Sequence, residues 1–230
     1  TSTGAKVDET TPVYPLTPYG ESKIRAEREI SGMADSNFSP VFLRNGTVYG
    51  VSPRLRVDIV LNNLVGWACT TGNVKLYTDG TPWRPLIHVE DVCDAFIAVM
   101  EAPVETVHNQ VYHVGSNKEN YQIRTLAEIV QSVVPGCGLE FSSDHEGDQR
   151  TYIADFTKIE ERLPQFQPKW TAEAGAHQLY EAYRRANLNL EEFTGSRYIR
   201  LKRIDELLRT GRLDANLRWQ RGTVETPRGR

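Results

Sequence analysis

The chain has 230 residues, of which 39% are hydrophobic and 25% are charged, and its formal net charge at pH 7 is -3. This composition is typical of a globular protein and gives no electrostatic reason to expect nucleic acid or an anionic membrane as a partner. The three cysteines lie far apart and the five histidines show no ligand spacing, so neither a disulfide framework nor a metal site is indicated. No apolar run approaches about 20 residues and no signal peptide opens the chain, so we expect a cytoplasmic protein without a membrane segment.

The predicted elements alternate between short β-like runs and amphipathic helices. Thr17 can serve as an N-cap and Pro18 as the first helical residue, which predicts a helix that runs to about Ala34. Further helices are expected around 61–68, 90–102, 123–134 and 155–163, and strands at 40–44, 74–77, 85–89 and 111–114. This alternation predicts an α/β sheet with helices on its faces. The rest of the chain is predicted to be mostly helical, at 172–186, 190–193 and 204–213.

Tyr19 and Lys23 are the most informative residues of the first predicted helix. Because they are four positions apart, the phenol and the ammonium group project from the same helical face. A cation beside a tyrosine stabilises phenolate and lowers a tyrosine pKa from its ordinary value of about 10, which favours proton transfer at neutral pH. The same spacing also occurs in solvated surface pairs, so the pair alone leaves both interpretations open.

Several longer motifs follow one another along the chain. They are PYGESK at 18–23, LRNGTVYG at 43–50, NNL at 62–64, DGTPWRPLIHVEDV at 79–92, YHVGS at 112–116 and DQRTYIAD at 148–155. With these motifs in this order, the chain resembles the extended short-chain dehydrogenase/reductases of the NAD-dependent epimerase/dehydratase family, which act on nucleotide sugars. The resemblance runs from the first residues to about Trp170. It implies an α/β fold with a partial Rossmann-type doubly wound parallel sheet and a smaller C-terminal α/β substrate domain, followed by a helical tail.

The resemblance also implies a division of the chain. Residues 1–50 and about 84–103 would form the C-terminal half of a dinucleotide-binding domain, and about 51–83 and 104–170 would bind the nucleotide sugar. Residues 171–222 would be a helical extension that caps the substrate side, joins an oligomer contact or is simply solvated. The tail 223–230 is expected to be disordered. A homodimer is expected for the full-length protein.

Catalytic and cofactor residues are implied by matching positions. Tyr19 resembles the general acid/base that exchanges a proton with a sugar hydroxyl, and Lys23 resembles the residue that holds the nicotinamide ribose. Asn45 matches a position beside the nicotinamide, with a polar turn residue as the alternative. Thr3 is the candidate for the family's catalytic Ser/Thr, although it precedes the tyrosine by fewer positions than is usual. The cofactor would be NAD or NADP, with the choice left open.

Substrate residues are implied in the same way. The substrate is expected to be a nucleotide sugar, whose diphosphate suits the planar fork of an arginine and the N-terminus of a helix. Arg84 and Asn63 match the family's diphosphate contacts, and Lys75 and Tyr77 match a strand that cradles the base. Asp148 resembles the carboxylate that binds the nucleotide ribose, and Arg150 is a second candidate phosphate contact.

Two departures from the family pattern bear on activity. The chain contains no glycine-rich dinucleotide loop, so we expect it to be a fragment that lacks the first half of the nucleotide-binding domain. Gly4 and Ala5 stand where 4,6-dehydratases usually carry an Asp-Glu pair, which favours epimerase-like chemistry over dehydration. A nucleotide-keto-sugar reductase, a dehydratase and a non-catalytic nucleotide-sugar-binding remnant remain as alternatives.

Overall fold

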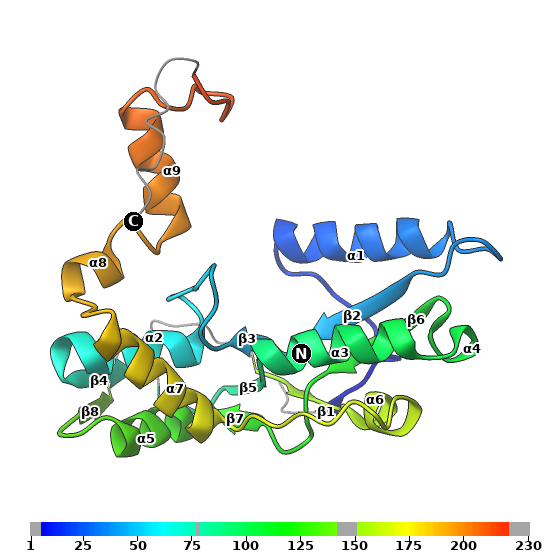
Figure 1. Cartoon of the computed structure of the whole chain (residues 1–230), viewed down its shortest axis with the longest axis horizontal. Helices are drawn as coiled ribbons and strands as arrows, with labels where there is room; N and C mark the ends of the chain where they lie inside the picture. The colour runs from blue at the N-terminus through cyan, green and yellow to red at the C-terminus, as the bar shows by residue number, and fades with distance from the viewer. Residues whose placement is uncertain (1–5, 77–78, 142–150, 221–230) are drawn as a thin grey trace.

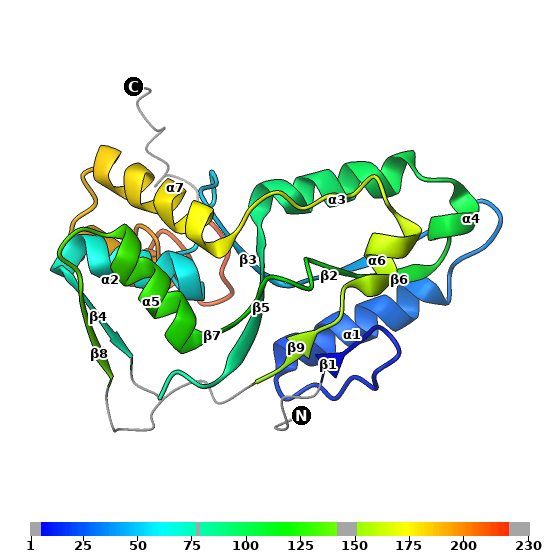
Figure 2. The same ribbon diagram turned by 90° about the horizontal axis from the view of Figure 1, so that it is seen from below.

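In this computed structural model, residues 6–76, 79–141 and 151–220 are described. Figure 1 shows helices and strands grouped into two lobes that meet near β3 and β5, with one C-terminal helix projecting from the body. Figure 2 shows the two lobes side by side.

The first lobe is built on two pairs of parallel strands. β2 (Val41–Asn45) pairs with β6 (Gln110–Val114) along its full length, and β1 (Lys6–Val7) pairs with β9 (Ile153–Ala154). Its helices are α1 (Pro18–Ser31), α3 (Val89–Glu101), α4 (Val104–Val107) and α6 (Thr157–Arg162). Ala95, Tyr112, Phe156 and Ile159 are fully buried between the strands and helices. Because β6 lies within 104–170, that segment contributes to the first lobe as well as the second.

A central group of strands links the lobes. β3 (Thr47–Tyr49) pairs in parallel with β5 (Trp83–His88), and β5 pairs in antiparallel orientation with β7 (Asn120–Gln122). The run of apolar residues in β5 was predicted to be a buried strand, and its last four residues are all buried. This arrangement carries the chain from the carboxyl end of β2 directly into the second lobe.

The second lobe packs helices over a parallel pair of strands. β4 (Asn73–Leu76) pairs with β8 (Gly138–Phe141), and α2 (Val60–Thr71), α5 (Ile123–Val133) and α7 (Ala172–Arg185) pack together beside them. The fully buried side chains at this contact are Leu61, Val65, Leu126, Val130, Ala176 and Leu179. The predicted extension is therefore not simply solvated, because α7 supplies part of the core.

The remaining helices leave the body of the molecule. α8 (Leu190–Thr194) is anchored by Phe193, whose ring packs edge-on against Trp67 at 5.3 Å between ring centroids. α9 (Arg200–Arg209) projects away from both lobes and buries only Leu207. The expected bounds 204–213 were wrong, because Gly211 adopts a positive φ of 68° and ends the helix early. Leu213 instead forms an isolated bridge with Trp219.

Most of the longer predicted elements are present with small shifts at their ends. The helix expected from 155 begins at Thr157, because the carboxylate of Asp155 accepts hydrogen bonds from the backbone N–H and hydroxyl of Thr157 and forms a turn instead. The strands β1, β7, β8 and β9 and the short α4 were not predicted from the sequence. In the part of the chain that the structure describes, no helix is long and apolar enough to cross a membrane.

Candidate functional site

A large cavity lies where the two lobes meet. Its volume is about 1340 Å³, and its walls come from α1, β2, the loop after β3, α2, β4 and β5. Six residues singled out from the sequence line this one cavity: Tyr19, Lys23, Asn45, Asn63, Lys75 and Arg84. The other four candidates, Thr3, Tyr77, Asp148 and Arg150, lie outside the described residues.

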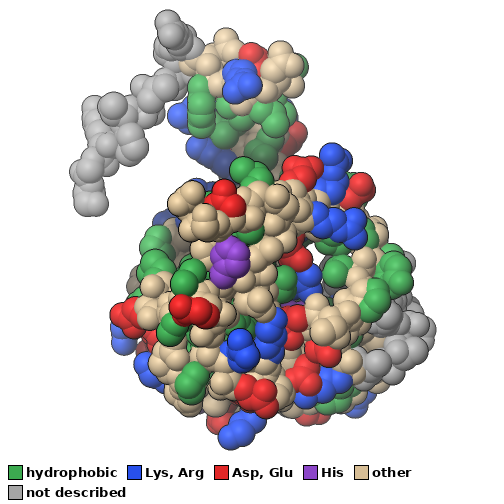
Figure 3. All heavy atoms as spheres, turned by 90° about the vertical axis from the view of Figure 1, so that its right-hand side faces the viewer, with side chains coloured by type: hydrophobic (Ala, Val, Ile, Leu, Met, Phe, Trp, Pro, Cys, Tyr) green, Lys and Arg blue, Asp and Glu red, His purple; other side chains and the backbone are tan. Residues whose placement is uncertain are grey.

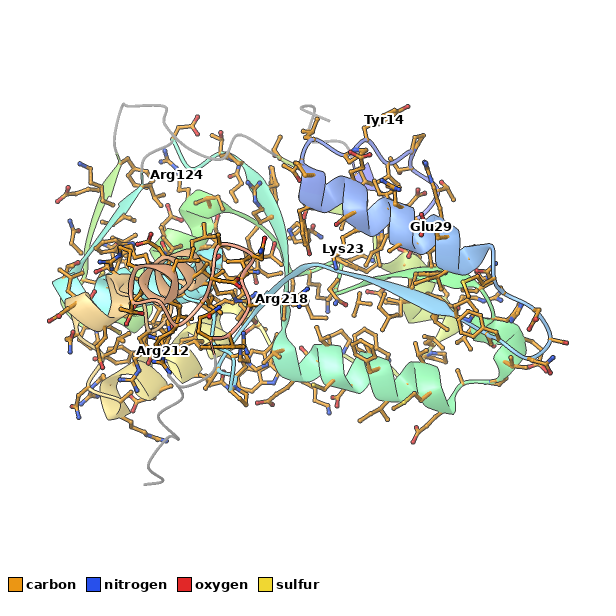
Figure 4. All side chains as sticks on the ribbon, turned by 90° about the horizontal axis from the view of Figure 1, so that it is seen from above. Tyr14, Lys23, Glu29, Arg124, Arg212 and Arg218 are labelled. Carbon is orange, nitrogen blue, oxygen red and sulfur yellow. The ribbon has the colours of Figure 1, made fainter. Side chains whose placement is uncertain are left out.

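The helix α1 presents Tyr19 and Lys23 to the cavity. It begins as predicted: Thr17 Oγ1 accepts a hydrogen bond from Gly20 N at 3.1 Å, and Pro18 occupies the first turn. The Lys23 Nζ lies 5.4 Å from the centroid of the Tyr19 ring. Figure 4 shows Lys23 on the side of α1 that faces β2, whereas Tyr14 lies on the opposite side. The tyrosine is 72% exposed, so its hydroxyl is open to a ligand in the cavity.

An ion pair connects α1 to the strand below it. Arg44 of β2 donates from Nε to Glu27 Oε2 at 3.0 Å and from Nη2 to Glu27 Oε1 at 2.6 Å. This fork geometry fixes direction as well as distance. No residue of α1 is buried, so the pair is a principal contact that sets where Tyr19 and Lys23 stand relative to Asn45.

The loop between β3 and α2 closes one wall of the cavity. Gly50 turns the chain with a positive φ of 110°, and its N–H donates to Asn62 Oδ1 at 3.0 Å. Asn62 Nδ2 in turn donates to Arg56 O, and Asn63 Nδ2 donates to Val57 O, each at 2.9 Å. The side-chain amide nitrogen of Asn63 therefore stabilises the loop. The sequence indicated only a diphosphate contact for this residue.

Arg56 is a cavity residue that the sequence reasoning missed. It lines the wall beside Tyr19, and its guanidinium donates from Nε to Asp58 Oδ1 at 3.0 Å. The hydrogen bond that Arg56 donates to Asp58 is the largest cause that raises the Arg56 pKa, and an electrostatic contribution from Tyr19 is the smallest, which places the two side chains near each other. Tyr152 also lines the cavity. The sequence signal for Arg56 was its place in the loop that directly follows the Val-Tyr-Gly motif.

The lining of the cavity is predominantly basic. It contains six cationic side chains and two carboxylates, Glu27 and Asp58. Both carboxylates are bound by arginines, Glu27 by Arg44 and Asp58 by Arg56. The cations of the lining are Lys23, Arg44, Arg54, Arg56, Lys75 and Arg84. This surplus of positive charge favours a ligand with two or more negative charges, such as a diphosphate.

Buried carboxylates hold the start of α7 against the central strands. Asp91 accepts hydrogen bonds from Lys169 N at 2.9 Å and Trp170 N at 3.1 Å. Glu119 accepts from Ala172 N at 2.9 Å and from the hydroxyl of Tyr121 at 3.1 Å. Burial raises the pKa of Glu119, because its charged form has left water. These bonds satisfy N–H groups at and just before the helix start that the helix itself cannot pair.

Two aromatic contacts complete this junction next to the cavity. The Tyr49 hydroxyl donates to Thr171 O at 3.0 Å, and burial raises its pKa well above the ordinary range. The ring of His88, which is fully buried, stacks on Trp170 with 3.9 Å between centroids. The cavity wall at Tyr49 is therefore tied to the C-terminal part of the chain.

The described residues contain no group of three or more His, Cys, Asp or Glu side chains placed to hold a metal ion. The arrangement of the lining residues is suited to proton transfer at the phenol of Tyr19 beside a lysine, and to anion binding by the surrounding cations. Asn45 lies at the carboxyl end of β2, and this edge of a parallel sheet is where ligands bind in open α/β folds.

Comparison with known proteins gives a family match and several relatives. Residues 2–115, about half of the chain, match the model of the NAD dependent epimerase/dehydratase family. A Haloferax volcanii protein described as low-salt glycan biosynthesis protein Agl12 is 26% identical, and the match covers 77% of this chain and 56% of that protein. A UDP-glucose 4-epimerase from Yersinia pestis is 26% identical, with 65% of this chain and 49% of that protein covered.

A dTDP-glucose 4,6-dehydratase from Xanthomonas campestris is also 26% identical, with 77% of this chain and 52% of that protein covered. The chain thus spans about half the length of these relatives. A solved structure, MoeE5 in complex with UDP-glucuronic acid and NAD, superimposes with a TM-score of 0.65 at 27% identity, over 79% of this chain and 60% of that one. Such solved structures confirm the predicted Rossmann-type α/β fold class.

Proposed function

The chain belongs to the NAD dependent epimerase/dehydratase family, and on this premise we propose that it binds a nucleotide sugar between its lobes and serves NAD-dependent, epimerase-like chemistry. The observation that carries the proposal is the cavity itself. Tyr19, Lys23 and Asn45 line it from the first lobe. Asn63 of α2 and Arg84 of β5, which follow β3 in the sequence, line the same cavity. Segments that are distant in the sequence thus converge on a basic site of about 1340 Å³, which is large enough for more than one ligand.

The residues present fit one end of NAD. A nicotinamide ribose could be held by the ammonium of Lys23 and the hydroxyl of Tyr19, with the nicotinamide beside Asn45 at the end of β2. When bound, NAD supplies a hydride acceptor and donor for a sugar carbon. The chain has no glycine-rich loop for the pyrophosphate, so this fit concerns the nicotinamide end alone.

The roles of the chain's own residues follow from their positions. The phenol of Tyr19 takes a proton from a sugar hydroxyl and later returns one, and the ammonium of Lys23 lies beside it, with 5.4 Å between Nζ and the ring centroid. Arg84, in the second wall, binds the diphosphate and holds the sugar near Tyr19, and Lys75 lies on the strand expected to cradle the base. Precise placement of this kind supplies much of the rate enhancement of a bound reaction.

The reaction subtype is also a proposal. A relative named as an epimerase and one named as a dehydratase match with the same identity, so the likeness supports both activities. Epimerisation needs only the proton-transfer pair and a bound nicotinamide, and we prefer it because Gly4 and Ala5 offer no second acid and base. Reduction of a nucleotide keto sugar would use the same residues, with NADPH as the hydride donor that exchanges as a substrate.

A second candidate is nucleotide-sugar binding without catalysis by this chain. It is favoured by one observation: α1, which carries Tyr19 and Lys23, has no buried residue, whereas the second wall of the cavity rests on a packed lobe. In that case Arg84 would matter for binding and Tyr19 would not matter at all. A homodimer is a further proposal, which light scattering after size-exclusion chromatography tests.

Calorimetry separates binding from catalysis. We expect the chain to bind UDP- or dTDP-sugars, and Arg84→Gln to weaken binding by about tenfold or more, because a charge-assisted contact to phosphate is lost. Arg185→Gln, an exposed arginine of α7 outside the cavity, is the matched control and should bind as the unchanged chain does. Equal affinity in both variants would refute the assignment of Arg84.

Turnover is tested by following sugar interconversion with NMR in the presence of NAD. Tyr19→Phe should lower turnover by about a hundredfold or more while nucleotide-sugar affinity is kept, since only the proton-transferring group is removed. Tyr14→Phe, an equally exposed tyrosine on the far side of α1, should be without effect. Tight nucleotide-sugar binding with no turnover in the unchanged protein would support binding without catalysis.

A further inference from the structure

A second, smaller cavity lies beside the first and belongs to a different part of the chain. Its volume is about 650 Å³, and it opens between the loop after Gly50 and the segment that joins α8 to α9. Four of its lining side chains are arginines: Arg54 from the loop, and Arg197, Arg200 and Arg203 from the C-terminal segment. Figure 1 shows the loop rising toward the base of α9, so the two segments that supply the arginines approach one another in space.

The positive charges of the four arginines are not neutralised by acidic side chains in the lining of this cavity. No aspartate or glutamate lines it. Arg197 is paired with Glu192, and Arg203 with Glu206 at 3.0 Å, whereas Arg54 and Arg200 form no ion pair within the described residues. The nearby carboxylate of Asp58 acts on Arg200 through space, but its own hydrogen bonds come from Arg56. Like charges gathered from two segments repel, and an anion between them relieves the repulsion.

The start of α9 adds to the imbalance. Its N-cap position is Ile199, which makes no side-chain capping bond, and its first turn holds no acidic residue. Arg200 and Arg203 instead stand at this positive end of the helix dipole, where cations are unfavourable. The first N–H groups of the helix and the guanidinium groups therefore both favour an anion at this position.

The remaining walls suit the organic part of a small molecule. Tyr198 lines the cavity, and its ring is covered by the Arg197 guanidinium with 5.6 Å between the guanidinium carbon and the ring centroid. Leu55 and Ile204 add apolar surface. Figure 3 shows hydrophobic side chains beside Lys and Arg side chains on the projecting part of the molecule.

We propose that this cavity binds a phosphate-bearing small molecule at a site separate from the nucleotide-sugar site. The guanidinium groups of Arg54 and Arg200 bind the phosphate oxygens, for which a planar fork is suited. Ser52 and Arg54 line both cavities, so the ligand also links α9 to the wall of the main cavity. This inference does not depend on the chemistry proposed for Tyr19.

The site is tested by titrating the whole chain with inorganic pyrophosphate at constant ionic strength and measuring heat. The main cavity is expected to bind this probe as well, so the titration is carried out in Arg84→Gln, in which binding there is weakened. In that background, Arg200→Gln with Arg203→Gln should weaken the remaining binding by about tenfold or more, because charge-assisted hydrogen bonds are removed. Arg209→Gln, on the same helix but outside the cavity and paired with Asp205, is the matched control.

The outcomes show whether the second cavity binds phosphate and whether its ligand is a nucleotide or a phosphate group alone. Pyrophosphate binding that survives in Arg84→Gln and is lost with Arg200 and Arg203 supports the proposal, and partial binding in Arg200→Lys supports a role for the planar fork. Tighter binding of ADP or UDP than of pyrophosphate identifies a nucleotide, and equal binding identifies phosphate alone. Binding that is abolished by Arg84→Gln alone, or unchanged in the double arginine variant, overturns the proposal.

Discussion

α1 and α7 are two helices of equal length with opposite surroundings. Each has 14 residues and each begins at a threonine N-cap, Thr17 or Thr171, whose side chain accepts a backbone hydrogen bond. Yet α1 buries no residue, whereas α7 buries five, including Leu179 and Tyr183. The local signals that start a helix therefore say nothing of how firmly the rest of the molecule holds it.

The difference lies in what each helix contacts. α7 packs against α2 and α5, its first turn is bound by Glu119, and the Tyr183 hydroxyl donates to Asn62 O at 3.2 Å. α1 is tied to β2 by the pair of Arg44 and Glu27. The candidate proton-transfer residues thus stand on the weakly held helix, and the C-terminal helix that carries none of them supports the cavity wall. We expect the two helices to respond differently to matched changes.

The largest difference is expected from removal of an apolar side chain. Leu179→Ala leaves a cavity at a fully buried position of α7 and should lower the free energy of unfolding by about 2–5 kcal/mol. Ile24→Ala, at a half-buried position of α1, should lower it by less than about 1 kcal/mol. Urea denaturation followed by circular dichroism measures both. Equal losses would mean that α1 is packed as firmly as α7.

A smaller difference is expected from a glycine in each helix. A Cβ at position 175 would lie 2.2 Å from Tyr49 Cε2, so Gly175→Ala should cost about 1–3 kcal/mol of stability through overpacking. A Cβ at position 20 would lie 3.4 Å from Pro15 Cβ, an ordinary contact, and Gly20→Ala should be neutral or slightly stabilising. Thermal unfolding distinguishes the two. A stable Gly175→Ala protein would show that Tyr49 can move.

The ion pair under α1 can be broken directly. Glu27→Gln should change global stability by no more than about 1 kcal/mol, because both side chains are partly exposed, but it should speed amide hydrogen exchange throughout α1. Glu29→Gln is the control, because Glu29 is exposed and lies two residues further along α1 than Glu27. It should leave the rate of amide exchange unchanged. Unchanged exchange in Glu27→Gln would mean that other contacts position Tyr19.

The smallest effect concerns pH and the start of α7. Because burial raises the pKa of Glu119 above the ordinary value of 4.5, its contribution to stability is fully present below that value and declines as the pH rises through the raised pKa. Glu119→Gln keeps the acceptor for Ala172 N and removes the titration, so its stability should fall less between pH 4 and pH 8. Glu173→Gln, in the first turn of the same helix, should follow the unchanged chain. Parallel pH profiles for all three proteins would contradict the shift.

Elements with strong local signals were predictable from the sequence. The Thr17 and Pro18 start of α1 is present as expected, and the buried run in β5 leads into α3 with Glu90 and Asp91 in its first turn. In contrast, β1, β8 and β9 are short and pair with segments that are distant in the sequence, so no local periodicity marks them. The end of α9 was misplaced because Leu213 continues the apolar spacing beyond the glycine that stops the helix.

The candidate site was predictable in part for the same reason. Motif residues such as Tyr19, Asn45 and Arg84 line one cavity, although their roles stay predictions. Arg56 and Tyr152 were missed because they lie outside regular elements, where only the folded chain reveals what they approach. The burial of α7 was likewise open, since an amphipathic pattern indicates that a face will be covered but does not identify the partner.

The buried ring of His88 contacts the docked helix α7 through a single proton. Its Nδ1 accepts from Glu90 N at 3.2 Å, so in the neutral ring the proton resides on Nε2, which donates to Gln178 Oε1 of α7 at 2.8 Å. The N–H of Glu90 thus selects one imidazole tautomer, and the docked helix supplies the acceptor for its proton. If α7 leaves, the Nε2 proton loses that acceptor, and the nitrogen chemical shifts of this single ring report whether the C-terminal helix is in place.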